Sequence, residues 1–283
     1  MIYLPIVGAV ALGAGTILEK IVLRVRKINI QLYQTASFLA IILAMLPFIY
    51  FFWRINSPAF TSTNLLILAL VIIFSMLANL FVFYSMKWEK VSNLEPAKVL
   101  EPLFVILLAI LFSYIFSEEL FERTLHIMIP AVLAGVALVA LHIRKHHLDF
   151  NKYFLAAIAG SFFFALELVT SRLILNFYSP ITFYFIRCSI IFLISLIAFR
   201  PNFKELNPKV RWQIFATGAI WFVYRVVIYF GYVNYGIVFT TLMIMLGPIF
   251  IYLFAWKFLK EKPGWRNLLA ALIIVGCVIY ASV

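Results

Sequence analysis

A stripe of cationic and aromatic side chains runs along the apolar stretch 212–233. On a helix Trp221, Arg225, Tyr229 and Tyr232 fall at i, i+4, i+8 and i+11, and they therefore share one face. A guanidinium offers a two-pronged fork for a carboxylate, so this face suits the wall of a pocket that binds an anionic group. The alternative is a structural arginine paired with a buried glutamate, with the tyrosines at the membrane interface.

Two further arginines lie within or just inside apolar stretches. Burying such a charge costs about 2.5–3.5 kcal/mol on insertion scales, so each should face a partner or a water-filled cavity. For Arg187 both a functional and a structural role remain open, whereas Arg172 lies near a helix end from which its side chain can snorkel. Glu167 precedes Arg172 by five residues, which is the wrong spacing for a pair within one helix. It therefore needs a partner across the bundle, such as Arg187 or Arg225.

Lys98 and Glu101 are three residues apart and can pair along a helix face. Pro96 and Pro102 flank this pair, and each removes a backbone donor, so the helix entrance should be bent. Two interpretations remain open. Glu101 carries a proton in a charged wall of the substrate path, or the pair simply caps the start of the helix.

Metal and cofactor chemistry has little support. His142 and His146 are four apart and His147 follows, but the only carboxylate or thiolate nearby is Asp149, so a solvated linker is favoured. The chain also lacks a phosphate-binding glycine loop and a nucleophile elbow. We therefore expect no enzyme activity, no metal and no cofactor.

These polar groups belong to a very apolar chain. Of its 283 residues 65% are hydrophobic and only 12% are charged, which predicts an all-α polytopic membrane protein. The net charge of +12 falls in short connections between apolar stretches, where it orients the protein in the membrane. We expect no nucleic-acid partner, and the pattern makes no prediction of the oligomeric state.

About 20 apolar residues are needed to cross the hydrocarbon layer. This rule predicts ten transmembrane helices, with turns at the intervening asparagine, proline and glycine residues. The expected spans are 3–23, 31–52, 65–86, 97–117, 125–143, 152–176, 180–199, 212–233, 238–258 and 265–283.

With ten spans, alternate connections share a side of the membrane. One side then holds 18 basic residues, whereas the other holds only Arg54 and Arg123. Because cytoplasmic loops are rich in lysine and arginine, the pattern places both termini outside the cytoplasmic (inner) membrane.

The apolar stretches come twice in the same order. Glu101-Pro102 is matched by Gly247-Pro248 at a shift of 146, and Asn79 before Phe83 is matched at the same shift by Arg225 before Tyr229. This divides the chain into repeats at 1–145 and 146–283, each with five spans. Because five is odd, the second copy is inserted upside down, as in many secondary transporters.

The chain resembles the EamA-type branch of the drug/metabolite transporter superfamily over nearly its whole length. The resemblance rests on the five-plus-five spans and on corresponding motifs in the two halves. These motifs are Ser92–Ala97, Glu101-Pro102, Glu118–Leu120 and Gly135 in the first half, and Val238–Thr241, Gly247-Pro248, Lys260–Lys262 and Gly276 in the second.

The resemblance implies two inverted repeats around a central cavity, lined by the first, third and fourth helices of each half. Arg187 falls outside this mapping. The residues that it places in the lining are Asn79, Phe83, Lys98, Glu101, Glu167, Trp221, Arg225, Tyr229, Thr241 and Met245.

The function expected from these features is secondary transport, by alternating access, of a small polar metabolite. An exported amino acid or related carboxylate fits best, with Arg225 on the carboxylate and with protons as a coupled partner. Two alternatives remain. Proton-coupled efflux of lipophilic cations would use Glu101 and an aromatic cage. A lipid-head-group flippase or a membrane-embedded enzyme is the other.

Overall fold

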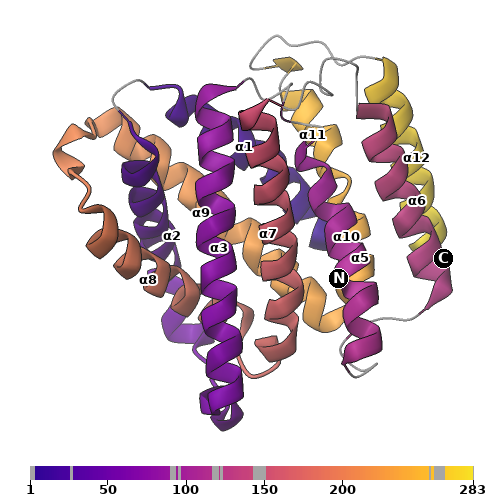
Figure 1. The fold of residues 1–283 in the computed structure, drawn as a ribbon, viewed down its shortest axis with the longest axis horizontal. Helices are drawn as coiled ribbons and strands as arrows, with labels where there is room; N and C mark the ends of the chain where they lie inside the picture. Colours follow the sequence, from indigo (N-terminus) through magenta and orange to yellow (C-terminus); the bar gives the residue numbers. More distant parts are fainter. Residues whose placement is uncertain are drawn as a thin grey trace.

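The computed structural model describes residues 4–25, 28–89, 94, 97–116, 121, 124–142, 151–254, 256–257 and 265–282. These residues form helices and short connections, without a β-strand (Figure 1). The α-helices are α1 (Leu4–Leu23), α2 (Ile30–Phe52), α3 (Ser62–Trp88), α5 (Leu100–Ile115), α6 (Leu125–His142), α7 (Lys152–Leu175), α8 (Pro180–Phe199), α9 (Pro208–Asn234), α10 (Ile237–Ile244), α11 (Gly247–Phe254) and α12 (Trp265–Ser282). The 3-10 helices are η1 (Ser57–Phe60) and η3 (Phe203–Glu205).

Polar side chains set the beginnings of the long helices. Asn29, Thr61, Asn151, Ser179 and Asn207 each accept a hydrogen bond from a backbone N–H in the first helical turn. Proline follows two of these caps at the first helical position, where its missing N–H costs nothing. Because of its Asn207 cap, α9 begins four residues before the predicted start at residue 212.

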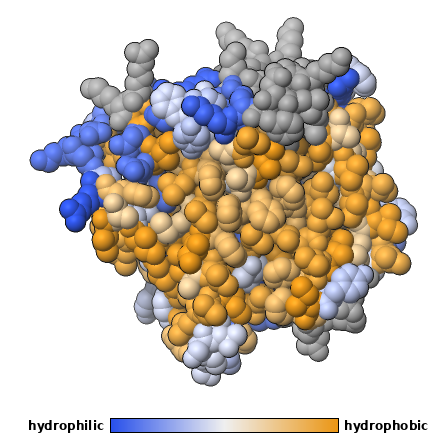
Figure 2. Space-filling view, viewed as in Figure 1, coloured by the Kyte–Doolittle hydropathy of each residue, from blue (hydrophilic) through white to orange (hydrophobic). Residues whose placement is uncertain are grey.

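The outer surface of the helices is apolar. Six helices of the described chain are long and apolar enough to cross a membrane, and shorter apolar helices cover 100–115, 125–141, 237–251 and 268–282. Large side chains such as Leu66, Ile197 and Leu272 are exposed on this surface. Figure 2 shows the resulting hydrophobic band across one face, with hydrophilic side chains gathered along the upper edge and the upper-left corner. A belt of this kind suits contact with lipid.

The helices of the two halves pair in a reciprocal manner. The first helix of each half packs on the third helix of the other, as α1 on α9 and α7 on α3. The second helices pack together as α2 on α8, and the last as α6 on α12 (Figure 1). Exchanging the halves therefore reproduces these four pairings. The predicted arrangement of ten helical spans in two inverted repeats is confirmed.

The ninth span departs from the prediction of one helix over 238–258. It consists of α10 and α11, which are separated by a turn at Met245 and Leu246. Pro248 has no N–H to donate to Ile244, and its ring would collide with the Ile244 carbonyl in a continuous helix. The Gly247-Pro248 pair therefore breaks the span in the middle of the bundle.

Hydrogen bonds between the α2–α3 and α7–α8 connections join the two halves at the lower edge of the molecule as drawn in Figure 1. Asn56 N donates to Phe177 O at 2.8 Å, and Ser179 N donates to Arg54 O at 3.1 Å. Arg54 N also donates to Thr182 Oγ1 at 3.0 Å, so the Thr182 hydroxyl adds a side-chain hydrogen bond to these backbone bonds. This contact fixes the end of α2 against the beginning of α8.

Replacing Thr182 with valine is expected to lower the free energy of unfolding by about 1–3 kcal/mol. The substitution keeps the shape of a fully buried side chain but leaves Arg54 N–H without its acceptor. Thermal unfolding of the purified protein in detergent measures the effect. Thr63→Val, the same change at an exposed position of α3, is the control, and equal stability of the two variants would contradict the prediction.

Candidate functional site

A cavity lies between the two halves. Its volume is about 130 Å³, counted as the space that the centres of water molecules can reach. At roughly 10–15 Å³ for each water molecule, it can hold a small metabolite or a cluster of waters. Its lining comes from α1, α2, α3, α5, α7, α8, α9, α10 and α11, so both repeats build it.

The cavity combines aromatic and polar walls. Seven aromatic side chains line it: Phe38, Phe83, Phe164, Tyr184, Trp221, Tyr224 and Tyr232. Its charged lining consists of Glu19, Lys98, Glu101, Arg187 and Arg225. A few directed polar groups in an apolar wall are typical of pockets that orient a small ligand.

A cluster of ionised and hydroxyl groups joins α7, α8 and α9 next to the cavity. Glu167 Oε2 accepts from Arg225 Nη1 at 2.9 Å, and Glu167 Oε1 forms an ion pair with Arg187 Nη1. Tyr229 OH donates to Glu167 Oε1 at 2.7 Å and also accepts from Arg187 Nη1. Ser171 Oγ, one turn along α7, donates to the same carboxylate oxygen at 3.2 Å. Both carboxylate oxygens therefore have partners, as a buried charge requires.

The positive charges of this cluster exceed its negative charges. Glu167 is fully buried and is absent from the cavity lining, whereas Arg187 and Arg225 both contact the cavity. The Arg187 guanidinium lies 4.8 Å from the Tyr184 ring, and that of Arg225 lies 5.0 Å from the Phe164 ring. These ring faces stabilise the cations without neutralising them. One carboxylate thus serves two arginines, and the cluster presents a net positive charge to the cavity.

A second polar contact joins α1 to α9. Trp221 Nε1 donates to Glu19 Oε2 at 3.1 Å, and both side chains line the cavity. Trp221 lies one helical turn before Arg225, so one face of α9 contacts both acidic side chains, Glu19 on α1 and Glu167 on α7. The sequence pattern pointed to this face of α9 but not to Glu19 on α1.

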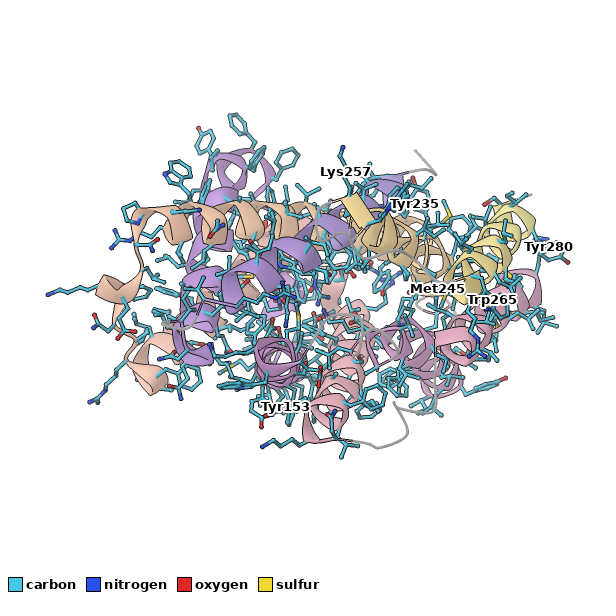
Figure 3. All side chains as sticks on the ribbon, turned by 90° about the horizontal axis from the view of Figure 1, so that it is seen from above. Tyr153, Tyr235, Met245, Lys257, Trp265 and Tyr280 are labelled. Atoms are coloured by element: carbon cyan, nitrogen blue, oxygen red, sulfur yellow. The ribbon has the colours of Figure 1, made fainter. Side chains whose placement is uncertain are left out.

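Seven of the ten predicted site residues line the cavity: Asn79, Phe83, Lys98, Glu101, Trp221, Arg225 and Thr241. Glu167 and Tyr229 instead lie behind the two arginines, where they hold the guanidinium groups. Met245 is fully buried in the turn between α10 and α11 and lies among the helices when the molecule is seen from above (Figure 3). Tyr153 and Tyr280 lie at the periphery in the same view.

Lys98 does not bond to Glu101, although the spacing predicted a pair. Lys98 Nζ lies 3.1 Å from Met86 Sδ on α3, and a turn at Val99 separates Lys98 from α5, in which Glu101 lies. The spacing of three residues therefore does not produce an ion pair between these two side chains in the described residues. Glu101 has no ion pair within the described part of the chain.

Arg187 and its neighbour Tyr184 are the main site residues that sequence reasoning left out. The resemblance assigned the lining to other helices, but α8 directs both side chains into the cavity. Their spacing of three residues, on one face of an apolar helix, was the available signal. Arg172, by contrast, donates to Asn176 Oδ1 at 2.8 Å near the end of α7, away from the cavity lining.

The described residues contain no group of three or more histidine, cysteine, aspartate or glutamate side chains that could hold a metal ion. The side chains of His142, His146 and His147 lie outside the residues that the structure describes.

Comparison with known families identifies the architecture. The model of the EamA-like transporter family matches the chain twice, over residues 1–141 and 151–283. The chain belongs to the EamA-like transporter family. This EamA-like protein is therefore an integral multi-pass membrane protein and a membrane transporter of the drug/metabolite transporter superfamily, a family of transporters rather than enzymes. The two matches correspond to the two repeats, and the predicted boundary at residue 145 falls outside the described residues.

Solved structures share this fold. One described only as "Crystal structure of protein" has a TM-score of 0.68 and 14% sequence identity, and the match covers 99% of this chain and 97% of that chain. At this identity the similarity concerns the fold alone. A comparison with curated protein sequences gives no significant match.

Proposed function

We propose that this EamA-like transporter moves a small polar metabolite that carries a carboxylate, an amino acid or a related compound, out of the cell by alternating access. One observation carries the proposal: Arg187 and Arg225 both line the cavity but share a single carboxylate, Glu167. The excess positive charge in an apolar surrounding favours an anionic group of the substrate.

The remaining lining supports a zwitterion. Arg225 uses Nη1 for Glu167, and the rest of its guanidinium can donate to a substrate carboxylate. Glu101 contributes a negative charge to the same cavity and suits an ammonium group. Trp221 and Phe83 would pack against the apolar part of the substrate.

Exposed basic residues gather at one edge of the molecule, which supports a cytoplasmic location for that edge. Both termini then lie on the opposite side of the inner membrane. Arg200, Lys204, Lys209 and Arg211 are exposed there, around the beginning of α9, whereas Arg54 is exposed at the opposite edge.

Glu101 is the carboxylate that we propose for proton coupling. It contacts the cavity and has no ion pair in the described part of the chain, whereas Glu167 is held by two arginines.

Arg225→Ala is expected to weaken the binding of carboxylate substrates by about 2–5 kcal/mol, and hence to reduce their transport at low concentration by roughly thirtyfold or more. Glu167 would keep its bond to Arg187, so the fold should survive. Uptake and efflux in proteoliposomes, with a panel of amino acids and organic acids, measure the effect. Arg54→Ala removes an exposed arginine and serves as the control. Unchanged transport of acidic and zwitterionic substrates by Arg225→Ala would remove the assignment.

Efflux of lipophilic cations is the second candidate, and the Glu19–Trp221 contact favours it. A carboxylate beside an indole ring, in a cavity that also contains Glu101, can bind a quaternary ammonium group. The same panel separates the two functions, because a cationic substrate should be bound better, rather than worse, after Arg225→Ala.

A further inference from the structure

The charge presented by the arginine pair depends on one residue that does not contact the cavity. Glu167 has no exposed surface, and its two oxygens are occupied by Arg187, Arg225 and Tyr229. The two guanidiniums and one carboxylate sum to a single positive charge. Tyr229 and Ser171 complete the shell around Glu167 with neutral hydroxyl groups. The cluster is therefore one negative charge short of neutrality.

The other charged side chains of the cavity, Glu19, Lys98 and Glu101, sum to one negative charge, which the ammonium group of a zwitterion can balance. Lys98 and Glu101 have opposite signs and both belong to the chain segment around the start of α5. Glu19 is bound by Trp221, on the α1 side of the cavity. Lys20, the neighbour of Glu19, donates to the carbonyls of Met86 and Glu89 at the end of α3. When the ammonium group of a zwitterion lies at these carboxylates, its carboxylate meets the single positive charge of the arginine pair and Glu167.

We propose that Glu167 is a positioning residue that matches this site to a group with one negative charge, the carboxylate of a zwitterionic metabolite, and disfavours doubly charged phosphate or phosphonate groups. The inference rests on the proposed function of the same cavity. A monoanion completes the neutralisation of the two arginines. A dianion would leave an uncompensated negative charge in an apolar site, which is costly.

The test compares amino acids with their phosphonate analogues, which have the same carbon skeleton and carry close to two negative charges at pH 8. Glycine, alanine and phenylalanine, each paired with its aminophosphonate, are titrated into the purified full-length protein. Affinities follow from the rise in thermal stability with ligand concentration. The parent should prefer the carboxylate of each pair. Glu167→Gln raises the charge of the cluster by one unit and should shift the ratio toward the phosphonate by about tenfold or more.

Two further variants keep the test decisive where Glu167→Gln fails to fold. Arg187→Gln lowers the cluster to zero net charge and should weaken carboxylate binding by about tenfold or more. The double variant Glu167→Gln/Arg187→Gln returns it to one positive charge and should restore the parent's preference. A purely structural role for Glu167 would not move the ratio back in this way.

The possible outcomes distinguish a failure of the proposed role of Glu167 from a failure of the proposed transport function. A parent ratio retained in Glu167→Gln, or a double variant that binds carboxylates no better than Arg187→Gln, overturns the role of Glu167 alone. Carboxylate binding that survives Arg225→Ala overturns the proposed function, and the inference with it.

Discussion

Replacing Glu167 with alanine lowers the free energy of unfolding by about 3–5 kcal/mol, the cost expected when a buried ion pair loses one partner. The loss should be at the upper end, because one carboxylate serves two guanidiniums. Arg187 and Arg225 are 2% and 5% exposed, so water cannot easily replace Glu167. Arg187 Nε already has no acceptor within the described chain, which leaves this arginine little alternative bonding.

Thermal unfolding in detergent and the yield of folded protein measure this loss. Glu205→Ala is the matched control, since Glu205 is exposed in η3 and has only a 3.4 Å contact with Asn202. Removing an arginine as well, in Glu167→Ala/Arg187→Met, should recover part of the stability, because one unpaired cation disappears. A single variant as stable as Glu205→Ala would show that the arginines find other partners.

Gly218→Ala is expected to be the most disruptive small change on α9, with a loss of about 1–3 kcal/mol. At Gly218 the helix approaches α2 so closely that an added Cβ would lie 2.8 Å from Ala40 Cβ and 2.9 Å from the Ala40 carbonyl carbon and Ile41 N. Two of these atoms belong to the backbone and cannot rotate away. The helices α2 and α9 would have to separate, and Arg225, two turns further along α9, would move relative to Glu167.

Gly276→Ala gives the matched control on α12, where an added Cβ meets nothing within 4 Å. There the substitution should be neutral or should stabilise by about 0.4–1 kcal/mol, through the smaller entropy of the unfolded chain. Apparent unfolding temperatures of the two variants test the contrast. Equal shifts in both would mean that the α2–α9 contact is less tight than the structure indicates.

The predicted face of α9 illustrates how much of the site could be found in the sequence. A period of 3.6 residues is a local property, so Trp221, Arg225 and Tyr232 were correctly placed on one face. Whether each side chain contacts the cavity or a neighbouring helix depends on helix rotation, which no spacing reveals. Tyr229 lies on the predicted face but bonds to Glu167 behind the arginines. Arg187 was set aside because of its helix, yet it lines the cavity.

By itself, the sequence determined the number of spans, their approximate limits and the existence of two repeats. The family model matches both halves of the chain. These properties follow from apolar length, capping residues and prolines, all of which act within a few residues of the chain. Only the tertiary structure decided which side chains share Glu167, because Arg187, Arg225 and Tyr229 lie 20, 58 and 62 residues away on other helices. The break between α10 and α11 has a local cause in Pro248. Its position beside the cavity, however, results from packing between the two halves.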